Sequence, residues 1–369
     1  MKNFLKNKNF WFFSSLAILF AAIFFIFFFN WTISYKLDSN GQIIKAIPPL
    51  NKIDYNVRLN LLAHTISTST ISTTTIAEIK NSTTSISFSK STSSSASLWP
   101  VKTVYPNPGA LLPFNRIVAY YGNLSSKAMG ALGQYPEEEM LSRLRADVQK
   151  WELADPNTPV IPALQYIAIT AQKSPGVDGK YRLRMPDTEI DKVIEMAKKV
   201  NGLVFLDLQI GQSTIQDELP LLEKYMKMPQ VHLAIDPEFS MKNGRIPGIY
   251  VGVCDAVDIN YAIDYLAKIV QDNNLSPKLF VVHRYRLEMV TNYKLIKTVP
   301  EVQIIMDMDG WGPLDNKLGS YIKYIYKEPV QFTGFKLFYR NDTWKPSTGL
   351  MTPEEILKLT PSPIYIQYQ

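Results

Sequence analysis

The chain is poor in the residues that build disulfide frameworks and many metal centres. It has one cysteine, Cys254, and three histidines, His64, His232 and His283, among 369 residues. A single cysteine excludes an internal disulfide and a thiolate zinc site, and three scattered histidines argue against a multi-histidine metal centre. The sequence therefore predicts neither a metal nor another cofactor.

Long runs of basic residues are also absent. The formal net charge is +6, and about half of it comes from Lys2, Lys6 and Lys8 near the N-terminus. The remaining charges are mixed in sign, and no Lys/Arg run is long enough to follow a phosphate backbone. We therefore expect no nucleic-acid partner.

One long apolar run is present, close to the N-terminus. Residues 10–29 are apolar except for two serines, and about 20 helical residues span about 30 Å, the thickness of a bilayer core. The run ends in three phenylalanines rather than in the small-x-small pattern of a cleaved signal peptide, so an uncleaved anchor is favoured. We predict a cytoplasmic segment at 1–9 and a transmembrane signal anchor at 10–32, held in membrane lipid. The preceding lysines would leave the rest of the chain outside the cell membrane.

The composition changes again after residue 64. About two thirds of residues 65–97 are serine or threonine, a composition that cannot bury a core and is typical of extracytoplasmic stalks. We therefore predict a Ser/Thr-rich, low-complexity stalk at 65–98. The juxtamembrane segment 33–64 mixes apolar and polar residues without a clear period and receives no assignment.

From residue 114 onward, β-rich runs alternate with helical stretches. The predicted strands are 116–121, 160–165, 203–209, 231–236, 278–283, 302–307, 334–339 and 363–368. Helices are predicted from residue 136, at 187–200, 215–227, 255–273, 286–297 and 315–326, and after Thr352, where Glu355 completes a capping box. Eight alternations of this kind match the α/β fold of a single (β/α)₈ TIM barrel at 114–369.

An open doubly wound sheet is the alternative fold. No Gly-x-Gly-x-x-Gly follows a predicted strand, which removes the usual reason to prefer it. The last predicted strand ends the sequence, so we expect the helix that would complete the outer layer to be missing or to come from before residue 114.

Polar residues follow the predicted strands at their carboxyl ends, where barrel enzymes act. Asp236 and Glu238 are two residues apart, as are Asp307 and Asp309, so each pair should face the barrel mouth if the strand continues. The candidate catalytic residues are Glu238, Asp236, Asp207 and Asp309. The candidate substrate-binding residues are Tyr120, Tyr121, Gln165, Gln209, His283, Arg284, Asp307, Trp311, Lys336, Tyr339 and Gln367.

This set of residues favours glycoside hydrolysis. Crowded carboxylates repel one another, which raises the pKa of at least one, and a protonated acid beside an ionised partner is what the reaction requires. Aromatic side chains near the strand ends would stack on a sugar ring, so a carbohydrate ligand is expected. Two residues along a strand are about 6.6–6.8 Å apart, which leaves retaining and inverting mechanisms both open.

Each candidate also has a structural interpretation. Residues 307–310 could form only a turn, Asp207 could pair with Lys336 or Arg284, and His283 could be satisfied within the barrel. The acids could instead hold Mg²⁺ or Ca²⁺ in a metal-dependent hydrolase. A non-catalytic barrel that binds a glycan or a surface would keep the same polar mouth.

Two short motifs resemble the barrel-type lysozymes. Asp236-Pro237-Glu238 matches their fourth strand and, more loosely, that of chitinases, and residues 365–368 match the end of their last strand. The resemblance implies Glu238 as proton donor with Asp236 as its partner. Those lysozymes carry an aspartate on the first strand, where this chain has Ala119, Tyr120 and Tyr121.

A broader resemblance covers residues 114–369. The segments 119–122, 205–211, 233–239, 306–310, 336–339 and 351–355 are similar to a group of uncharacterised bacterial lipoproteins and secreted proteins with a glycosidase-like TIM barrel. The resemblance implies a barrel outside the membrane and carries no assigned activity. This chain differs in having an apolar helix as its predicted anchor, where that group has a lipidated cysteine.

Overall fold

The computed structural model describes residues 35–37, 43–45, 47–65, 97–344 and 349–369, which belong to two units, Met1–Pro49 and Leu50–Gln369. In the first unit, β1 (Tyr35–Leu37) pairs antiparallel with β2 (Ile43–Lys45). The predicted anchor at 10–32 and residues 66–96 of the predicted stalk lie outside the described residues. Within the part that is described, no helix has both the length and the apolar character needed to cross a membrane.

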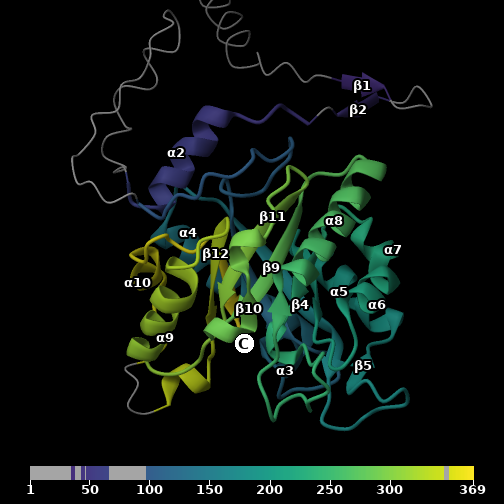
Figure 1. Ribbon diagram of the computed structural model, residues 1–369. Helices are drawn as coiled ribbons and strands as arrows, with labels where there is room; N and C mark the ends of the chain where they lie inside the picture. The colour runs from purple at the N-terminus through teal and green to yellow at the C-terminus, as the bar shows by residue number, and fades with distance from the viewer. Residues whose placement is uncertain (1–34, 38–42, 46, 66–96, 345–348) are drawn as a thin grey trace, which may run out of the picture. The chain divides into compact units, whose positions relative to one another are not determined.

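Eight parallel strands of the second unit close into a barrel (Figure 1). They are β3 (Arg116–Gly122), β4 (Val160–Ala171), β6 (Leu203–Leu208), β7 (Val231–Ile235), β9 (Lys278–Arg284), β11 (Val302–Met308), β12 (Phe332–Leu337) and β13 (Tyr365–Tyr368). β13 pairs with β3, and β3 pairs with β4, so the ring is complete. A short strand, β5 (Arg182–Arg184), joins β4 antiparallel at its far end. The predicted TIM barrel is therefore confirmed and the open sheet is wrong.

Both faces of each strand are buried, which explains the nearly continuous apolar runs in the sequence. On β6, Val204 and Leu206 face outward into the large core beneath the helices, whereas Phe205 faces inward. Phe205 joins Ala234 and Ile305 in the smaller core that fills the barrel. Because successive side chains on a strand point to opposite faces, this alternation also decides which polar residues can enter the barrel.

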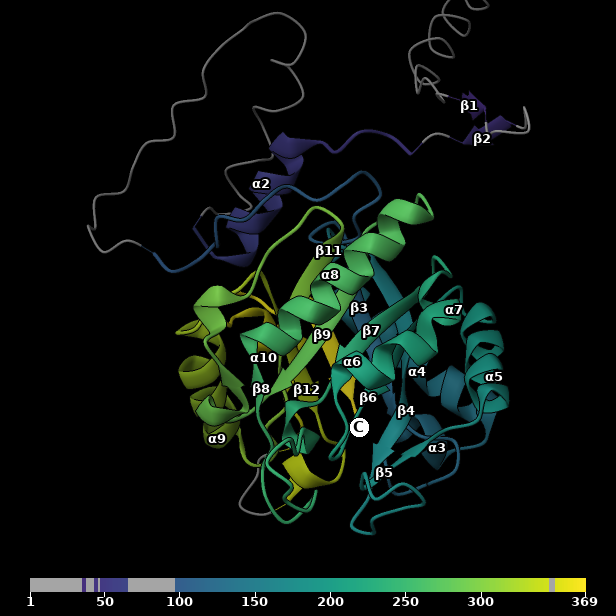
Figure 2. The same cartoon turned by 45° about the vertical axis from the view of Figure 1, so that its right-hand side comes forward.

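Helices cover the outside of the strands, as Figures 1 and 2 show. They are α3 (Ala131–Gln134), α4 (Glu137–Ala154), α5 (Asp187–Lys198), α6 (Ile215–Glu218), α7 (Glu223–Met226), α8 (Ala256–Asp272), α9 (Leu314–Ser320) and α10 (Pro353–Leu357). α10 opens with the predicted capping box of Thr352 and Glu355. α9 continues into a π-helical turn, η6 (Tyr321–Tyr326).

Two predicted helices are not continuous. The stretch 215–227 is interrupted by a 3₁₀ turn, η2 (Leu219–Leu222), where Pro220 has no N–H to donate. The stretch 286–297 is not a helix, because it consists of η4 (Leu287–Met289), β10 (Val290–Thr291) and η5 (Tyr293–Leu295), and β10 pairs with β8 (Cys254–Asp255). Asn292 adopts a left-handed φ of 57° between them, a conformation that interrupts a helix.

The amino-terminal end of the barrel is closed by chain that precedes β3. α2 (Lys52–Leu62) is capped by Asn51 and inserts Tyr55 into the inner core. The carbonyl of Leu62 accepts a 2.7 Å hydrogen bond from the N–H of Ser362, just before β13. Figure 1 shows α2 at the end of the strands opposite the C-terminus. The barrel unit thus begins at Leu50 rather than at residue 114, and it includes part of the segment that received no assignment.

The residues that flank the Ser/Thr-rich segment lie together. Leu62 and Ala63, which precede it, and Trp99 and Pro100, which follow it, line one small apolar pocket at the closed end of the barrel. α2 thus packs on the barrel before residue 66. The stalk at 65–98 stays a prediction.

A lysine is buried at this closed end. Lys278 begins β9 with no exposed surface, and its ammonium donates to the carbonyls of Met228 at 2.6 Å and Val231 at 2.9 Å. Burial lowers the pKa of Lys278 to about 7, because desolvation disfavours the charged form.

We predict that Lys278 makes the free energy of unfolding rise with pH. Between about pH 7 and about pH 10 the unfolded chain binds more protons than the folded chain, so the slope should reach up to about 1.4 kcal/mol per pH unit. Urea unfolding of Lys278→Met should show a flatter slope from about pH 8 to about pH 9.5. Lys192→Met, at an exposed position of α5, should keep the native slope. Equal slopes for Lys278→Met and the native protein would contradict the prediction.

Candidate functional site

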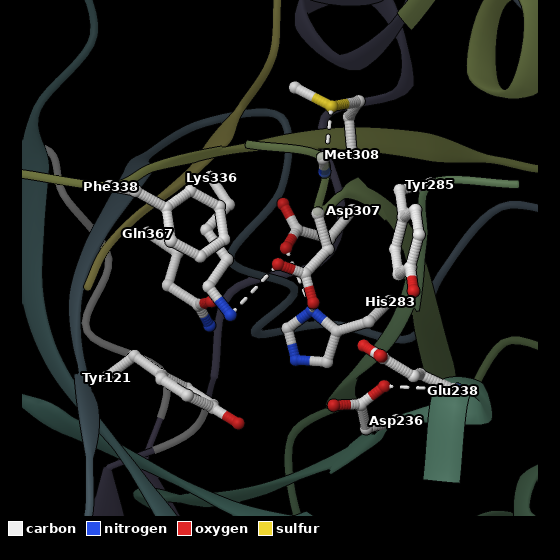
Figure 3. Close-up of polar contacts among 12 residues, drawn as sticks. Tyr121, Asp236, Glu238, His283, Tyr285, Asp307, Met308, Lys336, Phe338 and Gln367 are labelled. Carbon is white, nitrogen blue, oxygen red and sulfur yellow. Dashed lines mark hydrogen bonds and ion pairs between the residues drawn. The ribbon is translucent and has the colours of Figure 1, made fainter. Parts of the chain in front are cut away.

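Polar side chains converge at the carboxyl ends of the barrel strands (Figure 3). We call these residues the mouth cluster: Tyr121, Gln165, Asp207, Gln209, Asp236, Glu238, His283, Asp307, Asp309, Lys336, Tyr365 and Gln367. All of them except Glu238 are at most 7% exposed. Most of the cluster is therefore an internal network, and its parts differ in how far a substrate can reach them.

At the deepest level, His283 lies between two aspartates. Its Nδ1 is 2.9 Å from Asp307 Oδ2, and its Nε2 is 3.2 Å from Asp207 Oδ2. Burial alone would lower the pKa of His283, but the charge of Asp207 and the hydrogen bonds to both aspartates raise it well above its usual value. The two aspartates therefore favour the protonated form of His283, whereas Gln165 Nε2, which lies 2.7 Å from His283 Nε2, can donate only to a neutral ring. Asp207 pairs with His283 rather than with Lys336 or Arg284.

Two glutamines also form hydrogen bonds to neighbouring side chains inside the barrel. Gln165 Nε2 lies 2.9 Å from Asp207 Oδ2, and Gln165 Oε1 accepts a hydrogen bond from the Tyr365 hydroxyl. Gln367 Nε2 donates to the same hydroxyl at 3.1 Å. Sequence reasoning missed Tyr365, although its position two residues before Gln367 on one strand places both on the same face. Neither glutamine has exposed surface with which to bind a substrate.

Asp309 lies closer to solvent and is paired with a lysine. Lys336 Nζ is 2.9 Å from Asp309 Oδ1 and 3.8 Å from the centre of the Tyr121 ring, where it makes a cation–π contact. Gln209 Nε2 donates to the Tyr121 hydroxyl at 3.0 Å. Tyr121 thus faces the mouth as predicted, but its ring contacts Lys336 rather than being free to stack on a sugar.

Asp236 and Glu238 lie on a turn rather than on a continuing strand. β7 ends at Ile235, and η3 (Pro237–Phe239) follows as a 3₁₀ turn. Asp236 caps this turn, because its Oδ1 accepts the N–H of Glu238 at 3.2 Å. The expected strand alternation and its spacing therefore do not apply here. Figure 3 nevertheless shows the two carboxyl groups side by side.

Asp236 is the more deeply buried of these two acids. Burial raises its pKa well above the usual value, and the charges of Asp309, Glu238 and Asp207 act in the same direction. The charge of His283 acts in the opposite direction. Burial and the neighbouring acids therefore favour the protonated form of Asp236.

Glu238 combines a raised pKa with partial exposure. Burial and the charge of Asp309 raise its pKa, whereas Tyr285, Lys336 and Arg286 lower it. Its side chain lies beside the Tyr285 ring in Figure 3. Within the mouth cluster, Glu238 is the acid that a bound molecule can reach directly.

Two tyrosines predicted to bind substrate lie outside the barrel wall. The hydroxyls of Tyr120 and Tyr339 both donate to Asp147 of α4, at 2.6 Å for Tyr120. Their rings pack with each other and with Tyr368. Tyr120 and Tyr339 therefore hold α4 against the strands and cannot stack on a sugar in the mouth. Tyr120 and Tyr121 are neighbours on β3, and successive side chains of a strand point to opposite faces, so Tyr120 points outward and Tyr121 inward.

Arg284 is also structural. It has no exposed surface, and it pairs with Glu328 at 2.5 Å. Its guanidinium donates to four backbone carbonyls, those of Arg286, Leu287, Val290 and Tyr324. These bonds shape the loop after β9 and help to explain why no helix forms at 286–297. Trp311, in contrast, is exposed on the loop after β11.

The mouth acids are balanced by side-chain cations. Across the described ranges, no three His, Cys, Asp or Glu side chains are arranged to hold a metal ion. Asp307 and Asp207 instead contact His283, and Asp309 contacts Lys336.

Comparison with known proteins identifies no family for this chain. No family model matches the sequence, and no curated protein matches it. A solved structure with some likeness is Burkholderia cenocepacia dihydropteroate synthase in complex with 7,8-dihydropteroate. The TM-score is 0.32 at 9% sequence identity, over 69% of this chain and 86% of that chain. A likeness this low supports no statement about substrate or chemistry.

Gly334 makes room for the His283–Asp307 pair. A Cβ at this position of β12 would lie 2.5 Å from Asp307 Oδ1 and 3.0 Å from Cδ1 of Tyr365. Both distances are below normal van der Waals contact, and both atoms belong to buried, hydrogen-bonded side chains.

Gly334→Ala is therefore expected to push Asp307 away from His283 and to lower the free energy of unfolding by about 1–3 kcal/mol. Urea unfolding at neutral pH measures this. Gly319→Ala in α9 is the matched control, because a Cβ there meets no atom within 4 Å. Alanine at that helical position should stabilise the protein by up to about 1 kcal/mol. Equal stability of the two variants would show that Gly334 is not needed.

Proposed function

We propose that this barrel hydrolyses a glycosidic bond in a surface or environmental glycan. The observation that carries the proposal is Glu238, a partly exposed carboxyl group of raised pKa beside the buried acid Asp236. Both follow the fourth barrel strand, at the end of the fold where barrel enzymes act. Glycoside hydrolysis needs an acid that still holds its proton near neutral pH.

In this proposal Glu238 protonates the oxygen of the leaving sugar. Asp236 positions Glu238 by accepting its backbone N–H, and its own proton keeps a second negative charge away. Asp309 is the partner carboxylate, and the Lys336 ammonium lies 2.9 Å from its Oδ1. Asp309 would then activate a water molecule or attack the sugar carbon. Asp207 is not assigned this role, because it is fully buried against His283.

The proposed location rests on the sequence. The apolar run at 10–29 would hold the chain in the membrane, and the three lysines before it would leave the barrel on the outer side. The similarity of residues 114–369 to bacterial lipoproteins and secreted proteins supports the same location.

A glycan-binding barrel without catalysis is the second candidate. One observation favours it: most polar groups of the mouth cluster bond to each other rather than to solvent. Such a network is typical of a rigid scaffold, and a scaffold can present a surface without turnover.

The first test replaces Glu238 by glutamine, which has no carboxyl proton to donate. The full chain, purified in a mild detergent, is incubated with peptidoglycan, chitin, cellulose or starch, and released reducing ends are measured. Glu238→Gln should lower the rate by about 100-fold or more, because an amide cannot act as a general acid. Glu195→Gln, at an exposed position of α5, is the control and should retain the native rate. Native rates in Glu238→Gln would remove Glu238 from the mechanism.

The second test uses the pH dependence. The hydroxyl of Tyr285 lowers the pKa of Glu238, so Tyr285→Phe should raise it. A general acid is active while it is protonated, and activity is lost as pH rises through its pKa. The alkaline limb of kcat should therefore move to higher pH in Tyr285→Phe and stay in place in Tyr261→Phe on α8. A shift to lower pH would mean that Glu238 is not the titrating acid.

A further inference from the structure

Two tryptophans are exposed on neighbouring loops at the carboxyl ends of β11 and β12. Trp311 is 54% exposed and Trp344 is 56% exposed. Their ring centroids are 5.6 Å apart with an angle of 77° between the planes. Trp311 follows Asp309 by two residues, and Trp344 follows the 3₁₀ turn η7 (Asn341–Thr343). The pair therefore lies on the same side of the barrel as Glu238.

Both loops are held by one buried ion pair. Lys317 of α9 is 2.9 Å from Asp342 Oδ2, and both residues are almost fully buried. The Lys317 ammonium also donates to the carbonyl of Gly310 at 2.8 Å and to that of Lys336 at 2.7 Å. Gly310 directly follows Asp309, and Lys336 is the partner of Asp309. The Lys317 ammonium is therefore bonded to the backbone next to Asp309, through Gly310, and to the backbone of Lys336.

Asp342 completes the connection. Its Oδ1 accepts the N–H of Gly312 at 2.9 Å, and its Oδ2 accepts the N–H of Phe338 at 2.9 Å. Trp311 is thus held on both sides, through Gly310 and Gly312, and Trp344 is two residues beyond Asp342. The backbone on either side of Trp311 is therefore tied to the chain that carries Asp309 and Lys336.

We propose that Trp311 and Trp344 form a stacking subsite for a sugar ring of the glycan chain. The inference rests on the proposed function and defines its substrate as a glycan longer than one sugar. One ring would lie on the indoles while a neighbouring glycosidic bond reaches Glu238.

The surroundings of the two indoles favour a sugar over an apolar partner. An indole offers a large apolar face and one N–H donor, which matches the apolar face and hydroxyl rim of a pyranose. Asn341 and Thr343 precede Trp344, and glycines flank Trp311. Among the described residues of these two loops, the exposed area of large apolar side chains is limited to the two rings, which is small for a protein or membrane contact.

The test compares long and short substrates. Chitohexaose, cellohexaose and maltohexaose are assayed beside the 4-nitrophenyl glycosides of their single sugars, with the full chain in mild detergent. Trp311→Ala and Trp344→Ala should each raise KM for the hexasaccharide that is cleaved by about three- to tenfold. Their kcat, and their rates on the nitrophenyl glycosides, should stay within about twofold. Trp344→Tyr should give an intermediate KM because it keeps an aromatic ring.

Leu153→Ala is the matched control. Leu153 is a large apolar side chain exposed at the end of α4, and its replacement should leave every constant unchanged. Unfolding midpoints confirm that each variant folds. Native cleavage of a hexasaccharide with an unchanged KM in both tryptophan variants would overturn the subsite and leave the hydrolase proposal intact.

A different outcome separates the two proposals. If the native protein cleaves none of these substrates, tryptophan fluorescence titrations with the same hexasaccharides decide the matter. Binding by the native protein that Trp344→Ala loses would support the subsite while the hydrolase proposal fails. Equal binding by both proteins, or no binding by the native protein, would overturn the subsite.

Discussion

The contact of the buried His283 ring with Asp207 and Asp307 is the interaction on which the mouth of this barrel depends. Asp207 and Asp307 have no exposed surface, and a buried carboxylate is costly unless a cation faces it. His283 contacts both aspartates at once, and Lys336 pairs with Asp309. Burial raises the pKa of both Asp236 and Asp307, and in each case His283 acts in the opposite direction. The position of this ring among the mouth acids therefore bears on which of them can carry a proton.

The sequence was sufficient to predict the fold, because a barrel strand covered on both faces reads as a short apolar run and eight such runs alternate with helical stretches. It also located the acids at the strand ends. It was less reliable for the direction of individual side chains. Tyr120 and Arg284 were assigned to the mouth because they lie at strand ends, although Tyr121 and His283 beside them already point inward, and neighbours on a strand face opposite sides. The alternation of side chains between the two faces of a strand therefore matters as much as closeness to the strand end when residues of the mouth are predicted.

Other features depend on partners that are distant in sequence. α2 has no clear apolar period, and only its packing against chain far along the sequence gives it a place in the fold. The helix expected at 286–297 is replaced by turns whose carbonyls bind Arg284. The Lys317–Asp342 pair links loops that follow two different strands, and no local pattern predicts it. Local propensity gives way in each case to a contact that forms only once the barrel has closed.

The return of the chain to the closed end of the barrel has a consequence for how the Ser/Thr-rich segment can vary. Its flanking residues, Leu62 and Ala63 on one side and Trp99 and Pro100 on the other, line one pocket. The entropy of bringing two chain ends together grows only with the logarithm of the number of residues between them, by about 0.6 kcal/mol for each doubling. Insertions and deletions between α2 and Trp99 should therefore hardly change the stability of the barrel. What must be preserved is the docking of the two ends, and the number of residues between them is nearly free to change.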